Sequence, residues 1–204
     1  MQGDSLTLSG SNWKETLLAI LNGLENGASL NMRFNNGVLD PSSIEDQAQN
    51  SSDYFLQDLF EIAESPAMVV LSTSNENEYM LNGTKVKEEF QTPYDADTHD
   101  DEPGLQQISK KLGYPEGKYI NGNLGQTLVP RKANSPKRGS TNATIQVIIN
   151  GKGTLNQRTV GIAHEFGHVI LFLRGLPNGH TEKGVDEFVY KRATKMSKQL
   201  GYDF

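Results

Sequence analysis

One stretch decides the fold that this sequence predicts: LNQRTVGIAHEFGHVILFLR, residues 155–174. Its apolar residues recur at helical spacing, and Gly175 and Pro177 break the pattern, so we expect a helix that ends near Arg174. His164 and His168 are four residues apart, which places both imidazoles on one helix face. The opposite face is apolar and suited to a core, with Ile162, Phe166, Val169, Ile170 and Leu173.

The two histidines have the spacing with which a helix can bind one Zn²⁺. Glu165 lies about 100° further round the helix, where its carboxylate can reach a water on that ion. Gly161 and Gly167 flank the histidines, so other groups can approach this face closely. The pattern therefore predicts His164 and His168 as metal ligands and Glu165 as the catalytic base. The alternative is a core helix whose histidines are only hydrogen-bonded.

A catalytic zinc site uses three protein ligands and a water, so we expect a third ligand after this helix. His180 follows the turn-forming residues 177–179, which could fold the chain back towards the metal. Glu182 and Asp186 are the alternatives, because E-x-x-x-D is a form in which the glutamate binds zinc and the aspartate orients a ligand histidine. Glu187 is a weaker candidate, since its helix face carries Lys191 and is expected to be solvated.

Composition limits the classes of protein that fit. The chain has 204 residues, a net charge of −6 and no cysteine, so a metal site must use His, Asp, Glu or water. We expect no nucleic-acid partner, because there is no concentrated basic face, and no membrane span, because no run of 18 apolar residues exists. The first residues do not resemble a signal peptide. We therefore expect either a cytoplasmic protein or a domain of a larger exported protein. The oligomeric state is not set by the sequence.

We expect one domain over residues 1–204, with an N-terminal α+β part (1–140) followed by a strand, the metal helix and a C-terminal helix (141–204). The strand predicted before the metal helix could present an open edge on which an extended peptide pairs. The predicted elements are strands at 5–9, 30–34, 67–72 and 144–150, helices at 12–24, 52–64 and 185–200, a helical turn at 105–112, and a polar, turn-rich segment at 41–51.

The His164–His168 motif, the strand before it and the helix after it resemble the zincin superfamily of metallopeptidases. The resemblance implies an α+β fold in which a twisted mixed sheet packs on a central metal helix. It also implies that His164 and His168 bind Zn²⁺ and that Glu165 activates a zinc-bound water to hydrolyse peptide bonds. The metzincin extension is absent, because Leu171 and Arg174 stand where its glycine and third histidine would be. The size and the long polar middle are also similar to metallopeptidase domains of bacterial toxins and effectors.

The function that we predict is therefore a zinc metallopeptidase acting on a protein or peptide substrate. Peptide deformylase shares the motif but needs a cysteine ligand, which this chain lacks. A non-catalytic zinc-containing protein-binding module is the main alternative, although such a module has no need of a base at Glu165. Tyr190 could stabilise an oxyanion or could be a tyrosine at the edge of the core.

Overall fold

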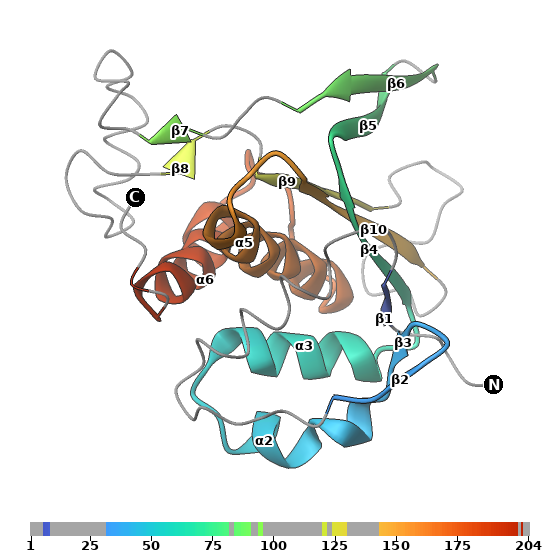
Figure 1. Ribbon diagram of the computed structural model, residues 1–204, viewed down its shortest axis with the longest axis vertical. Coiled ribbons are helices and arrows are strands. Elements are labelled where there is room, and N and C mark those ends of the chain that lie inside the picture. The colour runs from blue at the N-terminus through green and yellow to red at the C-terminus, as the bar shows by residue number, and fades with distance from the viewer. Residues whose placement is uncertain are drawn as a thin grey trace.

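The computed structural model describes residues 6–8, 32–81, 84–90, 94–95, 120–121, 124–129, 143–199 and 201. These residues form helices and a mixed sheet, which confirms the predicted α+β class (Figure 1). The helix predicted at 12–24 and the helical turn predicted at 105–112 lie outside the described residues. No helix in the described part of the chain is long and apolar enough to cross a membrane.

The described residues place six strands in the main sheet, in the order β2-β3-β1-β4-β10-β9. Its three central strands, β1, β4 and β10, are parallel, whereas β3 and β9 run antiparallel to their neighbours. Because β4 pairs with β10, the parts of the chain before and after residue 140 supply neighbouring strands. The strand bounds are β1 (Leu6–Leu8), β2 (Phe34–Asn35), β3 (Val38–Leu39), β4 (Met68–Ser74), β9 (Gly125–Leu128) and β10 (Thr144–Asn150).

The remaining strands form two small antiparallel pairs, β5 (Glu76–Leu81) with β6 (Thr84–Glu89) and β7 (Tyr94–Asp95) with β8 (Ile120–Asn121). The sequence pattern predicted none of them. The β5–β6 pair does have a signal, since Asn82-Gly83 stands between the two strands in the sequence and is a favoured hairpin dipeptide.

The described helices are η1 (Pro41–Ser43), α2 (Glu45–Gln49), α3 (Tyr54–Glu64), α5 (Leu155–Leu173) and α6 (Val185–Gln199). Residues 41–51, predicted to be polar and turn-rich, contain the two short helices η1 and α2. Ile44 and Ala48 are both buried in the core, so a few apolar anchors hold a segment whose composition is otherwise polar.

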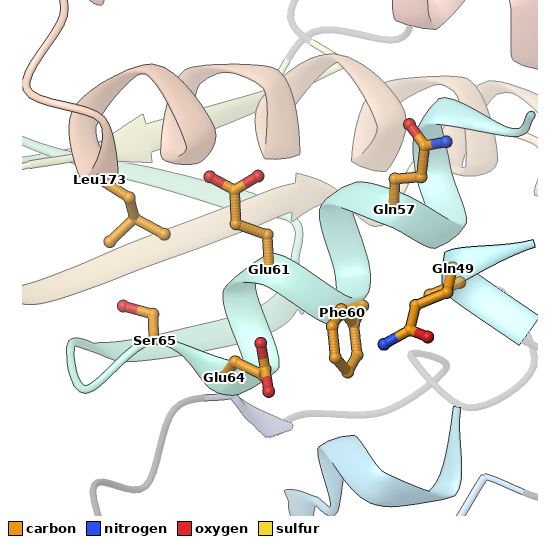
Figure 2. Close-up of a pocket in the computed structure, with 8 residues that line it drawn as sticks. Gln49, Gln57, Phe60, Glu61, Glu64, Ser65 and Leu173 are labelled. Atoms are coloured by element: carbon orange, nitrogen blue, oxygen red, sulfur yellow. The ribbon is translucent and has the colours of Figure 1, made fainter. Parts of the chain in front are cut away.

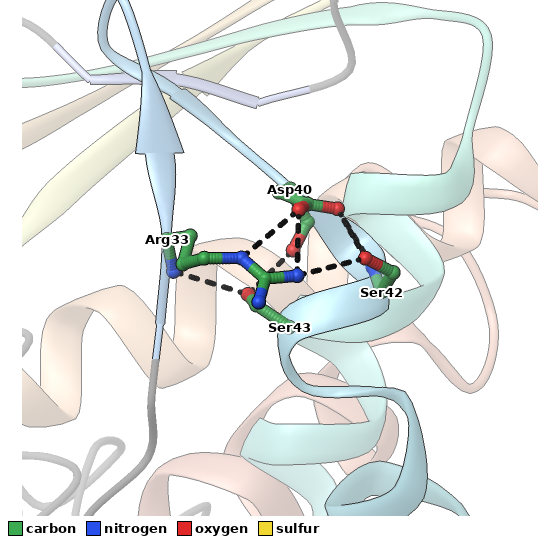
Figure 3. A network of polar contacts seen from close by, with 4 residues as sticks. All are labelled: Arg33, Asp40, Ser42 and Ser43. Atoms are coloured by element: carbon green, nitrogen blue, oxygen red, sulfur yellow. Dashed lines mark hydrogen bonds and ion pairs between the residues drawn. The ribbon is translucent and has the colours of Figure 1, made fainter.

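A hairpin through Asn36-Gly37 joins β2 to β3, with both residues at positive φ (50° and 81°) as a tight hairpin turn requires. The strand predicted at 30–34 therefore overlaps β2 only at Phe34. Asp40 accepts a hydrogen bond from the Ser42 backbone N–H at the start of η1 and pairs with Arg33 (Figure 3). The bond from the Ser42 side chain and then Arg33 hold the pKa of Asp40 below its usual value.

Helix α5 is central, with contacts to α3, α6, β9 and β10. It begins at Leu155, the first residue of the predicted helix. Thr154 and Gln157 form a reciprocal capping box there, which satisfies two backbone N–H groups. On its core side Phe166 stacks on Phe55 of α3, with ring centroids 5.4 Å apart. Alternate strand residues pack into the same core, namely Val69, Leu71, Ile145, Val147 and Ile149.

The two glycines of α5 lie where other elements approach most closely. A Cβ added at Gly167 would lie 3.1 Å from Val189 Cγ1 of α6, and one added at Gly161 would lie 3.2 Å from Leu124 just before β9. This matches the expectation that small residues beside the histidines admit neighbouring groups. Both neighbouring elements are thereby held against the histidine-bearing helix.

The prediction of an open edge at 144–150 was wrong, because β10 pairs with β4 on one side and β9 on the other. The run Val147-Ile148-Ile149 is apolar on both faces, which is typical of an interior strand. Among the described strands, the outer one beyond β10 is β9, a four-residue strand of sequence GQTL.

Candidate metal centre

Three histidine side chains converge at one point beside α5. His168 Nε2 lies 3.2 Å from His164 Nε2 and 3.1 Å from His180 Nε2. The ligand atoms of all three residues lie within 4.8 Å of one another. His168 is buried and His164 mostly so, whereas His180 lies at the surface. The group could therefore hold a metal ion, with one face open to solvent.

The chain reaches His180 through a sharp helix end. Gly175 has a positive φ of 72°, its N–H bonds to Phe172 O, and the Leu176 N–H bonds to Leu171 O. These two bonds form the Schellman arrangement that terminates helices at glycine. The loop that follows then returns alongside α5 and carries His180 to the two helix histidines.

Hydrogen bonds at Nδ1 set the tautomer of two of the three rings. Asn178 O lies 2.8 Å from His168 Nδ1, and because a carbonyl only accepts, this nitrogen carries the proton. Asp186 Oδ1 lies 2.6 Å from His180 Nδ1 and fixes that ring in the same way. In both rings Nε2 is therefore left as the lone-pair donor, and it is Nε2 that faces the shared centre.

The other candidates for the third ligand have different roles here. Glu182 Oε2 accepts hydrogen bonds from the backbone N–H groups of Asn178 (3.1 Å) and Gly179 (2.9 Å), so it braces the loop. Asp186 contacts the far side of the His180 ring, as an orienting carboxylate does. Glu187 is exposed on α6. Among the described residues, only the three histidines form a group with metal-ligand spacing.

The electrostatics of the site favour neutral imidazole. Burial, and then the neighbouring His168 and His180, lower the pKa of His164 well below 6.5. Protonating His164 would place a charge in a poorly hydrated site next to two other imidazoles. Since a metal binds the neutral ring, this histidine is held in the form that a metal requires.

Glu165, between the two helix histidines in sequence, points towards β9. Its side chain is buried, with 5% of the residue exposed, and the Thr127 hydroxyl donates to its Oε2 at 2.5 Å. Burial raises the pKa of Glu165 to about 7, and the bond from Thr127 acts in the opposite direction. A carboxyl group that titrates near neutrality is suited to taking and giving a proton. Sequence reasoning missed Thr127, because its partner is 38 residues away.

Tyr190 of α6 packs edge-on against the His164 ring, with ring centroids 4.7 Å apart. Burial, followed by the charges of Asp186 and Glu165, raises the pKa of Tyr190 to about 12. The phenol therefore stays protonated and can donate a hydrogen bond beside the histidines. Tyr190 is only partly buried, so both roles considered from the sequence are compatible with its position.

A separate surface pocket of about 450 Å³ lies between α2, α3 and the end of α5. Its lining includes Gln49, Phe60, Glu64 and Leu173 (Figure 2). Glu61 also lines it but is paired in two hydrogen bonds with Arg174. None of the residues that line this pocket belongs to the histidine group.

Neither a family model, nor a curated protein, nor a solved structure matches this chain. What the centre can do is therefore inferred from its geometry and chemistry alone.

Proposed function

We propose that this protein is a zinc-dependent metallopeptidase in which His164, His168 and His180 bind the metal and Glu165 is the general base. One observation carries the proposal. Three imidazole Nε2 atoms meet beside α5, and the residue after His164 in that helix, Glu165, has a buried carboxyl group with a pKa near neutrality. A merely structural metal site would gain nothing from that carboxyl group, because a buried ionisable group costs stability.

The donor set supports zinc over other common ions. Three histidines with one open position are a ligand set of catalytic zinc sites, whereas calcium and magnesium prefer oxygen donors. The fixed tautomers of His168 and His180 and the depressed pKa of His164 present three neutral nitrogens without further rearrangement. When bound, zinc would supply a Lewis acid that lowers the pKa of water and polarises a carbonyl group.

The remaining chemistry belongs to side chains of this protein. Glu165 takes a proton from water as the water oxygen bonds to the carbonyl carbon of the peptide. The same carboxyl group then delivers the proton to the amine nitrogen as the C–N bond breaks, so the products are a carboxylic acid and an amine. Tyr190 keeps its hydroxyl proton at neutral pH and could donate to the carbonyl oxygen as negative charge develops there.

The sheet edge favours an extended peptide as substrate. In the part of the chain that the structure describes, β9 is the outermost strand on the side of the sheet where Glu165 contacts Thr127. Backbone groups along an outer strand can pair with an added strand, and this would place its peptide bonds beside the base.

The test is metal analysis of the purified protein together with cleavage of a peptide library. We expect about one zinc per chain in the wild type, in Glu165→Gln and in the control Glu187→Gln, whose side chain is exposed on α6. We expect cleavage by the wild type and Glu187→Gln but not by Glu165→Gln. Zinc without cleavage of any peptide would favour a non-catalytic protein-binding module, and zinc-free protein under metal-replete conditions would refute the proposal.

A further inference from the structure

We infer that β9 positions the catalytic base, with Thr127 as the residue that holds the carboxylate of Glu165 and selects which of its oxygens transfers the proton. The inference rests on the proposed function and deepens it. It is carried by contacts between β9 and Glu165, and β9 carries none of the three histidines.

The register of β9 brings two of its residues against Glu165. Gly125 pairs with Ile149 and Thr127 with Val147 of β10, so these alternate residues lie on the same face of the sheet. Both contact Glu165, which shows that this face is the one that α5 covers. The intervening Gln126 points to the other face.

Gly125 provides the space that the glutamate side chain occupies. A Cβ added there would lie 3.1 Å from Glu165 Cγ, 3.0 Å from Ile149 Cδ1 and 2.9 Å from Ile148 O. The backbone oxygen cannot move aside without breaking the β9–β10 pairing, so the side chain of Glu165 would have to shift. A residue larger than glycine at position 125 is therefore incompatible with the observed position of the base.

Thr127 fixes the end of the same side chain. Its Oγ1 lies 2.5 Å from Glu165 Oε2 and 3.2 Å from the Glu165 backbone oxygen. The hydroxyl has one proton, and the shorter contact to the carboxylate is the stronger bond. Because this bond engages Oε2, we assign Oε1 as the oxygen that accepts the proton from water and delivers it to the leaving amine.

Thr127 contributes to catalysis by orienting the carboxylate of Glu165. A glutamate side chain has three rotatable bonds, and misplacing a reacting group by about 1 Å can cost about 100-fold in rate. Thr127 is thus a positioning residue that acts through Glu165. A Thr127→Val variant keeps the shape of the side chain and removes the hydroxyl, whereas Thr127→Ser keeps the hydroxyl.

The experiment uses zinc-loaded wild type, Thr127→Val, Thr127→Ser and the control Thr159→Val. The control also removes a buried hydroxyl bond, the one from Thr159 to Leu155 O within α5, but does not touch the base. Two quantities are measured: kcat and KM on a peptide that the wild type cleaves, and the carboxyl ¹³C resonance of Glu165. The resonance is assigned by its absence from Glu165→Gln.

We expect Thr127→Val to lower kcat about 10- to 100-fold with little change in KM, and to shift the Glu165 resonance. Thr127→Ser should restore both to near the wild-type values, and Thr159→Val should change neither. An unchanged kcat or an unshifted resonance in Thr127→Val would overturn the inference. If the wild type binds zinc and cleaves no peptide, the proposed function fails, and the resonance alone decides whether Thr127 holds the carboxylate.

Discussion

Replacing Glu165 with glutamine should stabilise the metal-free protein selectively at alkaline pH. The buried carboxyl group has a pKa of about 7 in the folded protein, against 4.5 for an ordinary glutamate. Between these values the folded state binds a proton that the unfolded chain has released, so the stability of the wild type falls as pH rises. From about pH 5 to pH 8 this loss amounts to about 2–3 kcal/mol of the free energy of unfolding.

Glutamine removes the ionisation but keeps an oxygen that can accept from Thr127. The burial of its NH₂ group adds a cost that does not depend on pH. The test is therefore how the free energy of unfolding changes with pH, and not its absolute difference between the two proteins. His164 also titrates, and its depressed pKa gives stability that is present above pH 6.5 and lost as pH falls below it. Because His164 is present in both proteins, the difference between them isolates Glu165.

The assay is urea unfolding of chelator-treated wild type, Glu165→Gln and Glu187→Gln at several pH values. Relative to the wild type, the free energy of unfolding of Glu165→Gln should rise by about 2–3 kcal/mol between pH 5 and pH 8. The exposed Glu187→Gln control should follow the wild type. Parallel curves for wild type and Glu165→Gln would show that the carboxyl group is not held protonated by burial, and would refute this account of the base.

Three further changes have defined outcomes. Asp186→Ala should weaken zinc binding about 10- to 100-fold in a chelator competition, because the third histidine loses its orienting partner; an equal loss in Glu187→Ala would contradict that role. Asp58→Ala should lower the free energy of unfolding in urea by about 3–5 kcal/mol, because it leaves the buried Arg192 guanidinium unpaired; a loss below about 1 kcal/mol would contradict this. Gly167→Val should cost about 1–3 kcal/mol by forcing α5 and α6 apart, and unchanged thermal stability would show that the contact relaxes freely.

The part of the fold nearest the site could be predicted because its signals are local. Helix α5 begins at Leu155 as expected, where Thr154 caps it, and ends at Leu173, one residue before the predicted end. Strand β10 has the predicted bounds, and α6 begins at Val185 as predicted. In each case the periodicity, cap or glycine that defines the element lies within the element or within two residues of its end.

Strand β9 could not be predicted, because its sequence GQTL has neither an apolar run nor a regular alternation. Its position depends on pairing with β10, some twenty residues further along the chain. The contact between Thr127 and Glu165 depends on that pairing, so it could not be predicted from the sequence either. The edge of the sheet was misplaced for the same reason, since β10 reads as an edge only if β9 is overlooked.

The third histidine shows where sequence reasoning reached its limit. Pattern alone left His180, Glu182 and Asp186 as alternatives, because each could reach the metal from the loop or the helix start. The structure gives the two carboxylates other partners: Glu182 accepts from loop N–H groups, and Asp186 contacts His180 Nδ1. The glycine at position 175 predicted the helix end, and its positive φ confirms it, but this signal does not specify which side chain the following loop brings to the helix histidines.

Whether three histidines of this chain bind one metal ion can be measured by zinc K-edge X-ray absorption of the zinc-loaded protein. We expect three imidazole nitrogens at about 2.0–2.1 Å together with one further light ligand. In His180→Ala the imidazole count should fall to two. Two imidazoles in the wild type, or a spectrum that His180→Ala leaves unchanged, would show that His164, His168 and His180 do not bind one metal ion together.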